Sequence, residues 1–104
     1  MPTSANRRRE PRHERALPVF IHGVLANGQR IKLHTCTDNI STGGLFLHLP
    51  YLLDSGAKLF AFIQLSSCAV LAVLAKIARI EYQDEGLSGV ALCFQQTRLM
   101  PLNV

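Results

Sequence analysis

The stretch "LPVFIHGVLANGQRIKLHTCT", residues 17–37, decides the fold class of this chain. Its first part is rich in β-branched and aromatic residues, and its last part alternates apolar and polar side chains, which is typical of β-strands. Between the two parts, Asn27 and Gly28 suit the positive φ angles of a type I′ turn. The stretch therefore predicts a β-hairpin, with alternate residues of 31–35 on one face of its second strand.

The rest of the chain continues this pattern of short apolar runs and turn formers. The turn-rich segments are "DNISTGG", "LDSGAK" and "DEG", and the strand-like segments are "LFLHLP", "LFAFIQL" and "SGVALCF". Residues 69–82, "AVLAVLAKIARIEY", suit a helix by propensity, yet their length also fits a long, bent strand. About six strands at short spacing predict an all-β fold, a six-stranded antiparallel, Greek-key-like barrel or else a sandwich.

Length and composition indicate one globular domain, because 104 residues with 48% hydrophobic and 17% charged side chains can bury one modest core. We expect a flexible basic arm over residues 1–15, a barrel over 16–96 and a tail over 97–104. Pro101 stops any helix that begins in the tail, so we expect a capping coil or a short turn and little or no C-terminal helix.

The cysteines and the apolar runs bear on location. Cys36, Cys68 and Cys93 are odd in number and form no CxxC motif, so we expect them to be buried, in a reducing compartment. The apolar stretch 59–75 contains Gln64 and two serines and is shorter than the roughly 20 apolar residues of a spanning helix. A membrane span is therefore the disfavoured interpretation.

Catalytic and metal-binding patterns are absent from the sequence. There is no HExxH, GxSxG, P-loop or GxGxxG motif, and the seven carboxylates form no acid–base pair. His34 and Cys36 share a strand face and could hold a metal together with His22 or His48, although a lone histidine on a half-exposed strand is the commoner case. We therefore predict neither an enzyme nor a metal site.

The charge of the chain is concentrated near its start. The segment "RRREPRHER", residues 7–15, holds five of the eleven Lys and Arg residues. Five basic residues less Glu10 and Glu14 leave residues 1–15 at +3, and six basic less five acidic residues leave the remainder at +1. This arm predicts an anionic partner, which charge alone leaves open between nucleic acid, nucleotide, membrane surface and acidic protein.

Two short motifs narrow that choice. Arg8 and Arg12 in "RREPR" form an RxxxR motif, and Asn39, Ser41 and Gly44 in "NISTGG" form a (D/N)xSxxG motif. In this order, with a strand pair between them, the motifs resemble the PilZ domain family, bacterial receptors for the second messenger cyclic di-GMP. The segments "GGLFL", "KIARI" and "SGVALCF" look like later strands of the family, so the resemblance covers most of the chain.

The sequence departs from the family pattern in two places. Family members commonly end in a helix packed across the barrel mouth, and Pro101 argues against one here. In the long strand, Ala and Leu replace the usual β-branched residues. These departures concern details of the fold and leave both motifs intact.

The resemblance implies a cyclic di-GMP site made of Arg7, Arg8, Arg12, Asn39, Ser41, Gly43 and Gly44. Arginine suits this ligand because one side chain both neutralises phosphate and stacks on guanine. By resemblance, Arg8 and Arg12 clasp phosphate and guanine, Asn39 and Ser41 hydrogen-bond a guanine edge or phosphate, and the two glycines allow close approach of the backbone.

Three further arginines have open roles. Arg7 precedes the RxxxR motif, as in family members that bind the messenger as an intercalated dimer, and it would then meet the second molecule's phosphate. Arg9 is as readily a solvated charge as a contact. Arg79 could approach a second ligand molecule, but a surface ion pair with Glu81 or Asp84 is the favoured interpretation.

The predicted function is that of a receptor that relays cyclic di-GMP to a protein partner the sequence does not identify. The alternatives are a small barrel that binds nucleic acid through its basic arm, and a module that only docks to proteins. Nucleic acid is not expected, because barrels that bind it present aromatic rings on their strands, whereas most of the five Phe residues here look like core.

Overall fold

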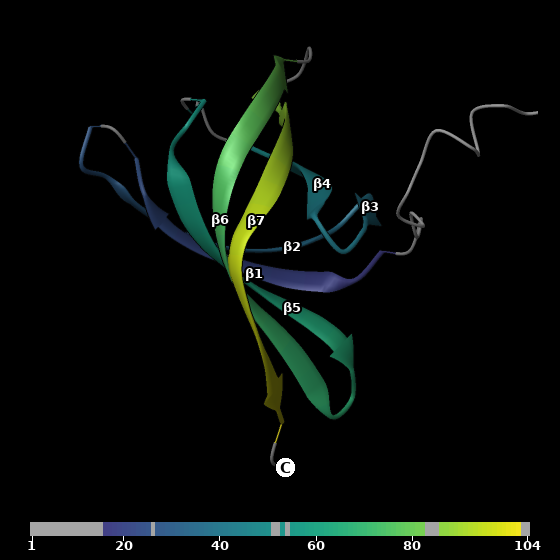
Figure 1. Ribbon diagram of the computed structural model, residues 1–104. Helices are drawn as coiled ribbons and strands as arrows, with labels where there is room; N and C mark the ends of the chain where they lie inside the picture. Colours follow the sequence, from purple (N-terminus) through teal and green to yellow (C-terminus); the bar gives the residue numbers. More distant parts are fainter. Residues whose placement is uncertain (1–15, 26, 51–52, 54, 83–85, 103–104) are drawn as a thin grey trace, which may run out of the picture.

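A computed structural model of the protein describes residues 16–25, 27–50, 53, 55–82 and 86–102. The predicted arm lies outside these residues, and so do Arg7, Arg8 and Arg12. The described part of the chain forms strands and contains no helix (Figure 1). The strands are β1 (Pro18–Val24), β2 (Arg30–Cys36), β3 (Asn39–Ile40), β4 (Gly44–Leu49), β5 (Lys58–Ser66), β6 (Ala69–Tyr82) and β7 (Ser88–Pro101).

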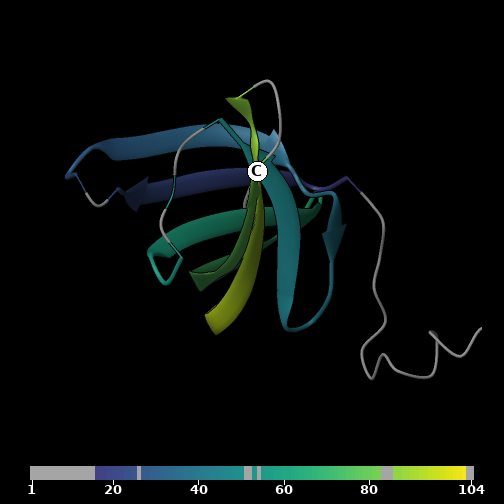
Figure 2. The ribbon, with the colours of Figure 1, turned by 90° about the horizontal axis from the view of Figure 1, so that it is seen from above.

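All strands join one antiparallel sheet with the order β2-β1-β5-β6-β7-β4-β3. The sheet curls strongly, so that it forms a half-barrel (Figure 2). The pairings β1–β5 and β4–β7 join strands distant in sequence, as in a Greek key. The predicted all-β antiparallel fold is thus confirmed. The strand count is seven instead of six, because the two residues of β3 pair within the segment predicted only as a turn.

The predicted first hairpin is present, with Pro18 opposite Cys36 and Val24 opposite Arg30. Its turn is longer than predicted. The Leu25 N–H donates to the Gln29 carbonyl at 2.7 Å, and the Gly28 N–H donates to the Leu25 carbonyl at 2.9 Å. Gly28 has a φ of 89°. A three-residue loop that ends in a left-handed glycine therefore replaces the two-residue type I′ turn.

The ambiguous segment 69–82 is strand β6 along its whole length. It pairs with β5 on one side and with β7 on the other, so tertiary pairing overrides the helix propensity of Ala and Leu. Alternate side chains at Val73, Ala75 and Ile77 enter the core. In the described part of the chain, no helix has the length and apolarity needed to span a membrane.

Two bulges bend the β6–β7 hairpin. In β6, Ile77 faces Leu92 while Arg79 faces Ala91, which leaves Ala78 as an extra residue. In β7, the extra residue is residue 95. Each extra residue switches the side of the sheet on which the following side chains lie, and it increases the local twist.

The core is built from aliphatic residues. Its most buried large side chains are Val19, Ile21, Ile31, Leu47, Leu49, Leu59, Ile63, Ile77 and Val90. The prediction that most Phe residues belong to the core is wrong. Phe94 packs against the core only in part, and the other four stand at strand positions alternate to the buried ones, on the outer face. Phe60 is 51% exposed.

The cysteine prediction is wrong in the same way, since Cys36, Cys68 and Cys93 are all free and exposed. Cys36 and Cys93 lie at outward strand positions, and Cys68 lies in the β5–β6 turn. The predicted C-terminal coil also differs, because β7 continues to Pro101, which pairs with Ala69 of β6.

Candidate functional site

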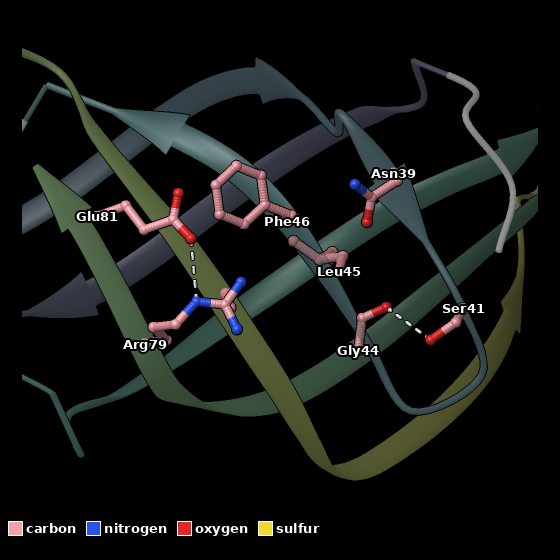
Figure 3. A pocket seen from close by; sticks show the side chains of 8 residues that line it. Asn39, Ser41, Gly44, Leu45, Phe46, Arg79 and Glu81 are labelled. Atoms are coloured by element: carbon pink, nitrogen blue, oxygen red, sulfur yellow. Dashed lines mark hydrogen bonds and ion pairs between the residues drawn. The ribbon is translucent and has the colours of Figure 1, made fainter. Parts of the chain in front are cut away.

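The motif loop borders a hollow of about 400 Å³ on the outer face of the sheet (Figure 3). Strands β3, β4, β6 and β7 contribute to its walls. The lining residues are Asn39, Ser41, Gly44, Leu45, Phe46, Arg79, Glu81 and Ala91. Three of the seven site residues predicted from sequence, Asn39, Ser41 and Gly44, thus meet in one place.

Strand register explains why this set comes together. Asn39 faces Phe46, Phe46 faces Ala91, and Ala91 faces Arg79. The four residues form one row across β3, β4, β7 and β6. Because Ile77 is buried, regular alternation would direct Arg79 into the core, and the extra residue Ala78 instead directs it outward. The bulge therefore adds a cation to the hollow.

Arg79 is the one cationic side chain among the lining residues. Its Nε donates to Glu81 Oε2 at 3.1 Å, so the ion pair favoured from sequence is confirmed, with Glu81 as the partner. The two side chains are 64% and 51% exposed, and solvent screens their attraction. The hollow thus contains a guanidinium that an anion can reach.

Phe46 forms the apolar wall between Arg79 and Asn39 (Figure 3). A β-carbon on Gly89 would lie 2.7 Å from the tip of the Phe46 ring, so the glycine makes room for the ring. His48 contacts the same ring edge to face, with centroids 5.4 Å apart, and its Nδ1 lies 2.7 Å from Asp38 Oδ2. These neighbours hold Phe46 in place.

The NISTGG loop is closed by its own hydrogen bonds. The Ser41 N–H donates to the Gly44 carbonyl at 2.8 Å, and the Gly43 N–H donates to Ser41 Oγ at 3.3 Å. Ser41 Oγ in turn donates to the Gly44 carbonyl at 3.4 Å. The Phe94 N–H donates to the Gly43 carbonyl at 2.9 Å, which ties the loop to β7. Ser41 therefore shapes the loop in addition to lining the hollow.

Glycine is required at position 44 for a structural reason that the sequence did not suggest. A β-carbon at this position would collide with the Leu92 carbonyl oxygen of β7. Backbone atoms cannot move aside as a flexible side chain can, so β4 approaches β7 this closely only with glycine at 44. This requirement holds independently of any ligand.

The arm joins the sheet beside this loop. The Leu17 N–H donates to Thr37 Oγ1 at 3.1 Å, and the Thr37 N–H donates to the Leu17 carbonyl at 2.9 Å. Thr37 is 2% exposed and stands two residues before Asn39. Leu17 is thus bonded to a residue that lies two positions before Asn39 of the hollow.

Phe46 was not singled out from the sequence, although a signal for it exists. In a strand that begins at Gly44, residues 44 and 46 share a face, so a ligand near the glycine would also meet the ring. The considered metal ligands are not brought together, since no group of three His, Cys, Asp or Glu side chains within the described ranges could hold a metal.

Comparison with known proteins agrees with this geometry. A family model described as the PilZ domain matches residues 6–99. The chain is a member of the PilZ domain family. The match includes the arm motif and the loop motif in one continuous stretch, and it confirms the resemblance drawn from the two motifs. A search of curated proteins found none that matches significantly.

Two solved structures share the fold. The inhibitor of motility MotI/DgrA of Bacillus subtilis has a TM-score of 0.71 at 23% identity, over 88% of this chain and 44% of the other. YcgR of Escherichia coli, solved in complex with cyclic di-GMP, has a TM-score of 0.63 at 21% identity, over 86% of this chain and 38% of the other. This PilZ chain therefore spans less than half the length of either protein.

Proposed function

We propose that this PilZ domain binds cyclic di-GMP in the hollow beside the NISTGG loop, with Arg8 and Arg12 of the arm closing over the ligand. The observation that carries the proposal is the meeting of Asn39, Ser41 and Gly44 with Phe46 and Arg79 around one hollow. Membership of the PilZ family and the ligand in the YcgR complex support it.

The chemistry of the hollow matches the ligand, which has two phosphodiester anions and two flat guanines. The Arg79 guanidinium can pair with a phosphate oxygen. The Phe46 ring offers an apolar surface for a guanine, and the Asn39 amide has both a donor and an acceptor for a guanine edge. No step in this account breaks a covalent bond, so we propose a receptor and not an enzyme.

The attachment of the arm supports the role of the arginines. Leu17 is fixed beside Thr37, and Arg12 is five residues before Leu17. Five extended residues reach about 17 Å. The arm is therefore long enough to place Arg12 up to that distance from Leu17, and Arg8 further, which supports their proposed role over the hollow.

The proposed output is a change of the arm. We propose that ligand binding fixes Arg8 and Arg12 over the hollow and thereby creates a surface for a protein partner in the bacterial cytoplasm. Arg7 extends the proposal to an intercalated ligand dimer, in which it meets the second molecule's phosphate. Gly43 contributes by giving the backbone access to the ligand.

Calorimetric titration of cyclic di-GMP tests the proposal. We expect the wild type to bind with a ligand-to-protein ratio near two. Arg8→Ala or Arg12→Ala should weaken binding by about ten- to a hundredfold, because a hydrogen bond to a charged group contributes roughly 1.5 to 3 kcal/mol. Arg9→Ala removes the same charge from the arm outside the motif and is the matched control. GTP is the control ligand.

Three outcomes would contradict parts of this account. Equal binding by the wild type and both arginine variants would exclude the arm as the clasp. A ratio near one would remove the role of Arg7. The absence of any binding by the wild type would overturn the receptor function itself.

A further inference from the structure

Five aromatic rings gather on the outer face of β1, β2 and β5, away from the hollow. We name the set Phe20, His22, His34, Phe60 and Phe62 the aromatic face. The Phe20 ring centroid lies 4.6 Å from that of His34, 6.2 Å from that of Phe62 and 6.4 Å from that of His22. Four of the rings are therefore connected through Phe20, and Phe60 lies opposite His22 on the neighbouring strand.

Strand register arranges these rings in two parallel rows of outward side chains. The first row is His34, Phe20, Phe62, Ala72 and Arg98, and the second is Lys32, His22, Phe60, Leu74 and Gln96. Five of these ten side chains are rings, and each row ends in a cation. Two shallow hollows meet at Phe62, one toward Pro18 and Gln64 and the other toward Arg98.

Cations border the aromatic face. The next row across the sheet contains Arg30, Val24, Lys58 and Lys76, with Val24 opposite Arg30 and Lys58 opposite Lys76. Strands β1, β2 and β5 contain no Asp or Glu. In the described part of β6, Glu81 is the acidic residue, and it is paired with Arg79 at the other site. Among the described residues, the face therefore combines rings with positive charge and no carboxylate.

Half-buried and exposed rings beside cations that have no acidic partner among the described residues suit a ligand that offers flat bases and phosphates at once. Bases of a single strand can stack on aromatic side chains, whereas the bases of a duplex are stacked on one another and cannot reach a sheet. Lysine is depleted in protein–protein interfaces, yet Lys32, Lys58 and Lys76 border these rings. The composition thus favours nucleic acid over protein as the occupant.

We infer that the aromatic face binds single-stranded nucleic acid, with bases stacked on Phe20, Phe60 and Phe62 and phosphates paired with Lys58, Lys76 and Arg98. Nucleic acid is not expected from the sequence only because the Phe residues look like core residues there. Their outward positions remove that reason. This site is separate from the proposed cyclic di-GMP site and does not depend on it.

Fluorescence anisotropy with the full chain tests the inference, with a labelled 12-nucleotide oligo-dT as the probe. A 12-unit abasic strand is the matched control ligand, since it has the phosphates without the bases. We expect the abasic strand to bind at least tenfold more weakly, because stacking is the sequence-tolerant part of such binding. Equal binding of the two strands would overturn the inference and assign the binding to phosphate attraction alone.

Variants locate the binding on the sheet. Phe60→Ala with Phe62→Ala should weaken oligo-dT binding at least tenfold, while Phe46→Ala, which removes a ring from the other half of the sheet, should leave it unchanged. Phe60→Leu keeps an apolar side chain without a ring and tests the inference if the double variant is unfolded. Binding should also weaken less steeply with salt in the variant Lys58→Ala with Lys76→Ala. The slope of the logarithm of the binding constant against the logarithm of the salt concentration should become smaller by about 1.4.

Two controls test the alternatives that the arm binds the strand and that a second copy of the chain covers the aromatic face. The variant Arg8→Ala with Arg12→Ala should bind oligo-dT more tightly than the abasic strand by the same factor as the wild type. Loss of that preference in the variant would assign the binding to the arm instead. Sedimentation should give the same mass for the wild type and Phe60→Ala. A dimer that becomes a monomer in the variant would show that a second copy covers this face, and would overturn the inference. Oligo-dT binding that is unaffected by the ring variants would do the same.

Discussion

Arg79 and Glu81 form an ion pair at the rim of the hollow, with 3.1 Å between Nε and Oε2. Ile80, which lies between them in β6, packs against the core. The Ala78 bulge sets this alternation, so that Arg79 and Glu81 both lie on the outer face. The Glu81 carboxylate is therefore already paired with the Arg79 guanidinium to which an anionic ligand would bind. In the proposed complex, a phosphate of the ligand would compete with the Glu81 carboxylate for Arg79.

This competition predicts opposite effects for its two members. Glu81→Gln should strengthen cyclic di-GMP binding by about two- to fivefold, because exposed pairs contribute up to about 1 kcal/mol. Arg79→Ala should weaken binding by about tenfold. Calorimetric titration measures both, and Arg98→Ala, which removes a cation elsewhere on the sheet, is the control. Weaker binding by Glu81→Gln would show that Glu81 contacts the ligand itself.

The Phe46 ring is the predicted stacking surface for a guanine. Phe46→Leu should weaken cyclic di-GMP binding by about tenfold, because an aliphatic side chain fills the space without a flat face. Phe60→Leu makes the same change on the aromatic face and should leave cyclic di-GMP binding unaltered. Equal losses in both variants would point to a general effect on the sheet.

Asn39 and Ser41 should differ in what they contribute. Asn39→Ala should weaken ligand binding by about tenfold with little change in thermal stability, because its amide lies at the hollow. Asn27→Ala, in the β1–β2 turn, is the matched control. Ser41→Ala should also lower stability by about 0.5 to 1 kcal/mol, because its hydroxyl closes the loop. Thermal unfolding without ligand separates the two effects.

Gly44 should matter for folding before it matters for binding. Gly44→Ala should destabilise the protein by about 1 to 3 kcal/mol, because the added carbon meets the Leu92 carbonyl oxygen. Thermal unfolding of the free protein measures this. An unchanged melting temperature with lost cyclic di-GMP binding would instead support the interpretation from sequence, in which the carbon collides with the ligand.

Thr37 should link stability to the arm. Thr37→Val leaves the buried Leu17 N–H without its hydroxyl acceptor and should cost about 1 to 3 kcal/mol. If the hydrogen bond between Leu17 and Thr37 positions Arg12, the variant should also bind cyclic di-GMP more weakly. Thr35→Val, in strand β2 opposite Val19, is the control. Equal cyclic di-GMP binding by the two variants would show that the Leu17–Thr37 bond does not affect the site.

The sequence predicted the strands well where apolar and polar residues alternate, as in residues 30–36. It left residues 69–82 ambiguous, because the choice between helix and strand depends on pairing with β5 and β7, which local propensity does not contain. The two residues of β3 were missed for the same reason.

The candidate site was predicted in part. The loop motif identified Asn39, Ser41 and Gly44, whereas the place of Arg79 depends on a bulge that no local pattern announces. The Phe residues were assigned by hydrophobicity alone, although strand parity assigns Phe20 and Phe62 to the face opposite Val19 and Ile63. Parity was the better guide because the concave interior of this sheet is filled by aliphatic side chains.

The long β6–β7 hairpin supports both halves of the outer face. The half nearer its turn supplies Arg79 and Ala91 to the hollow, and the other half supplies Ala72 and Arg98 to the row that contains Phe62. If both proposed ligands bind, a change in the twist of this hairpin at one site would alter the free energy of binding at the other. By thermodynamic reciprocity, whatever factor the messenger imposes on a strand of nucleic acid, that strand imposes on the messenger.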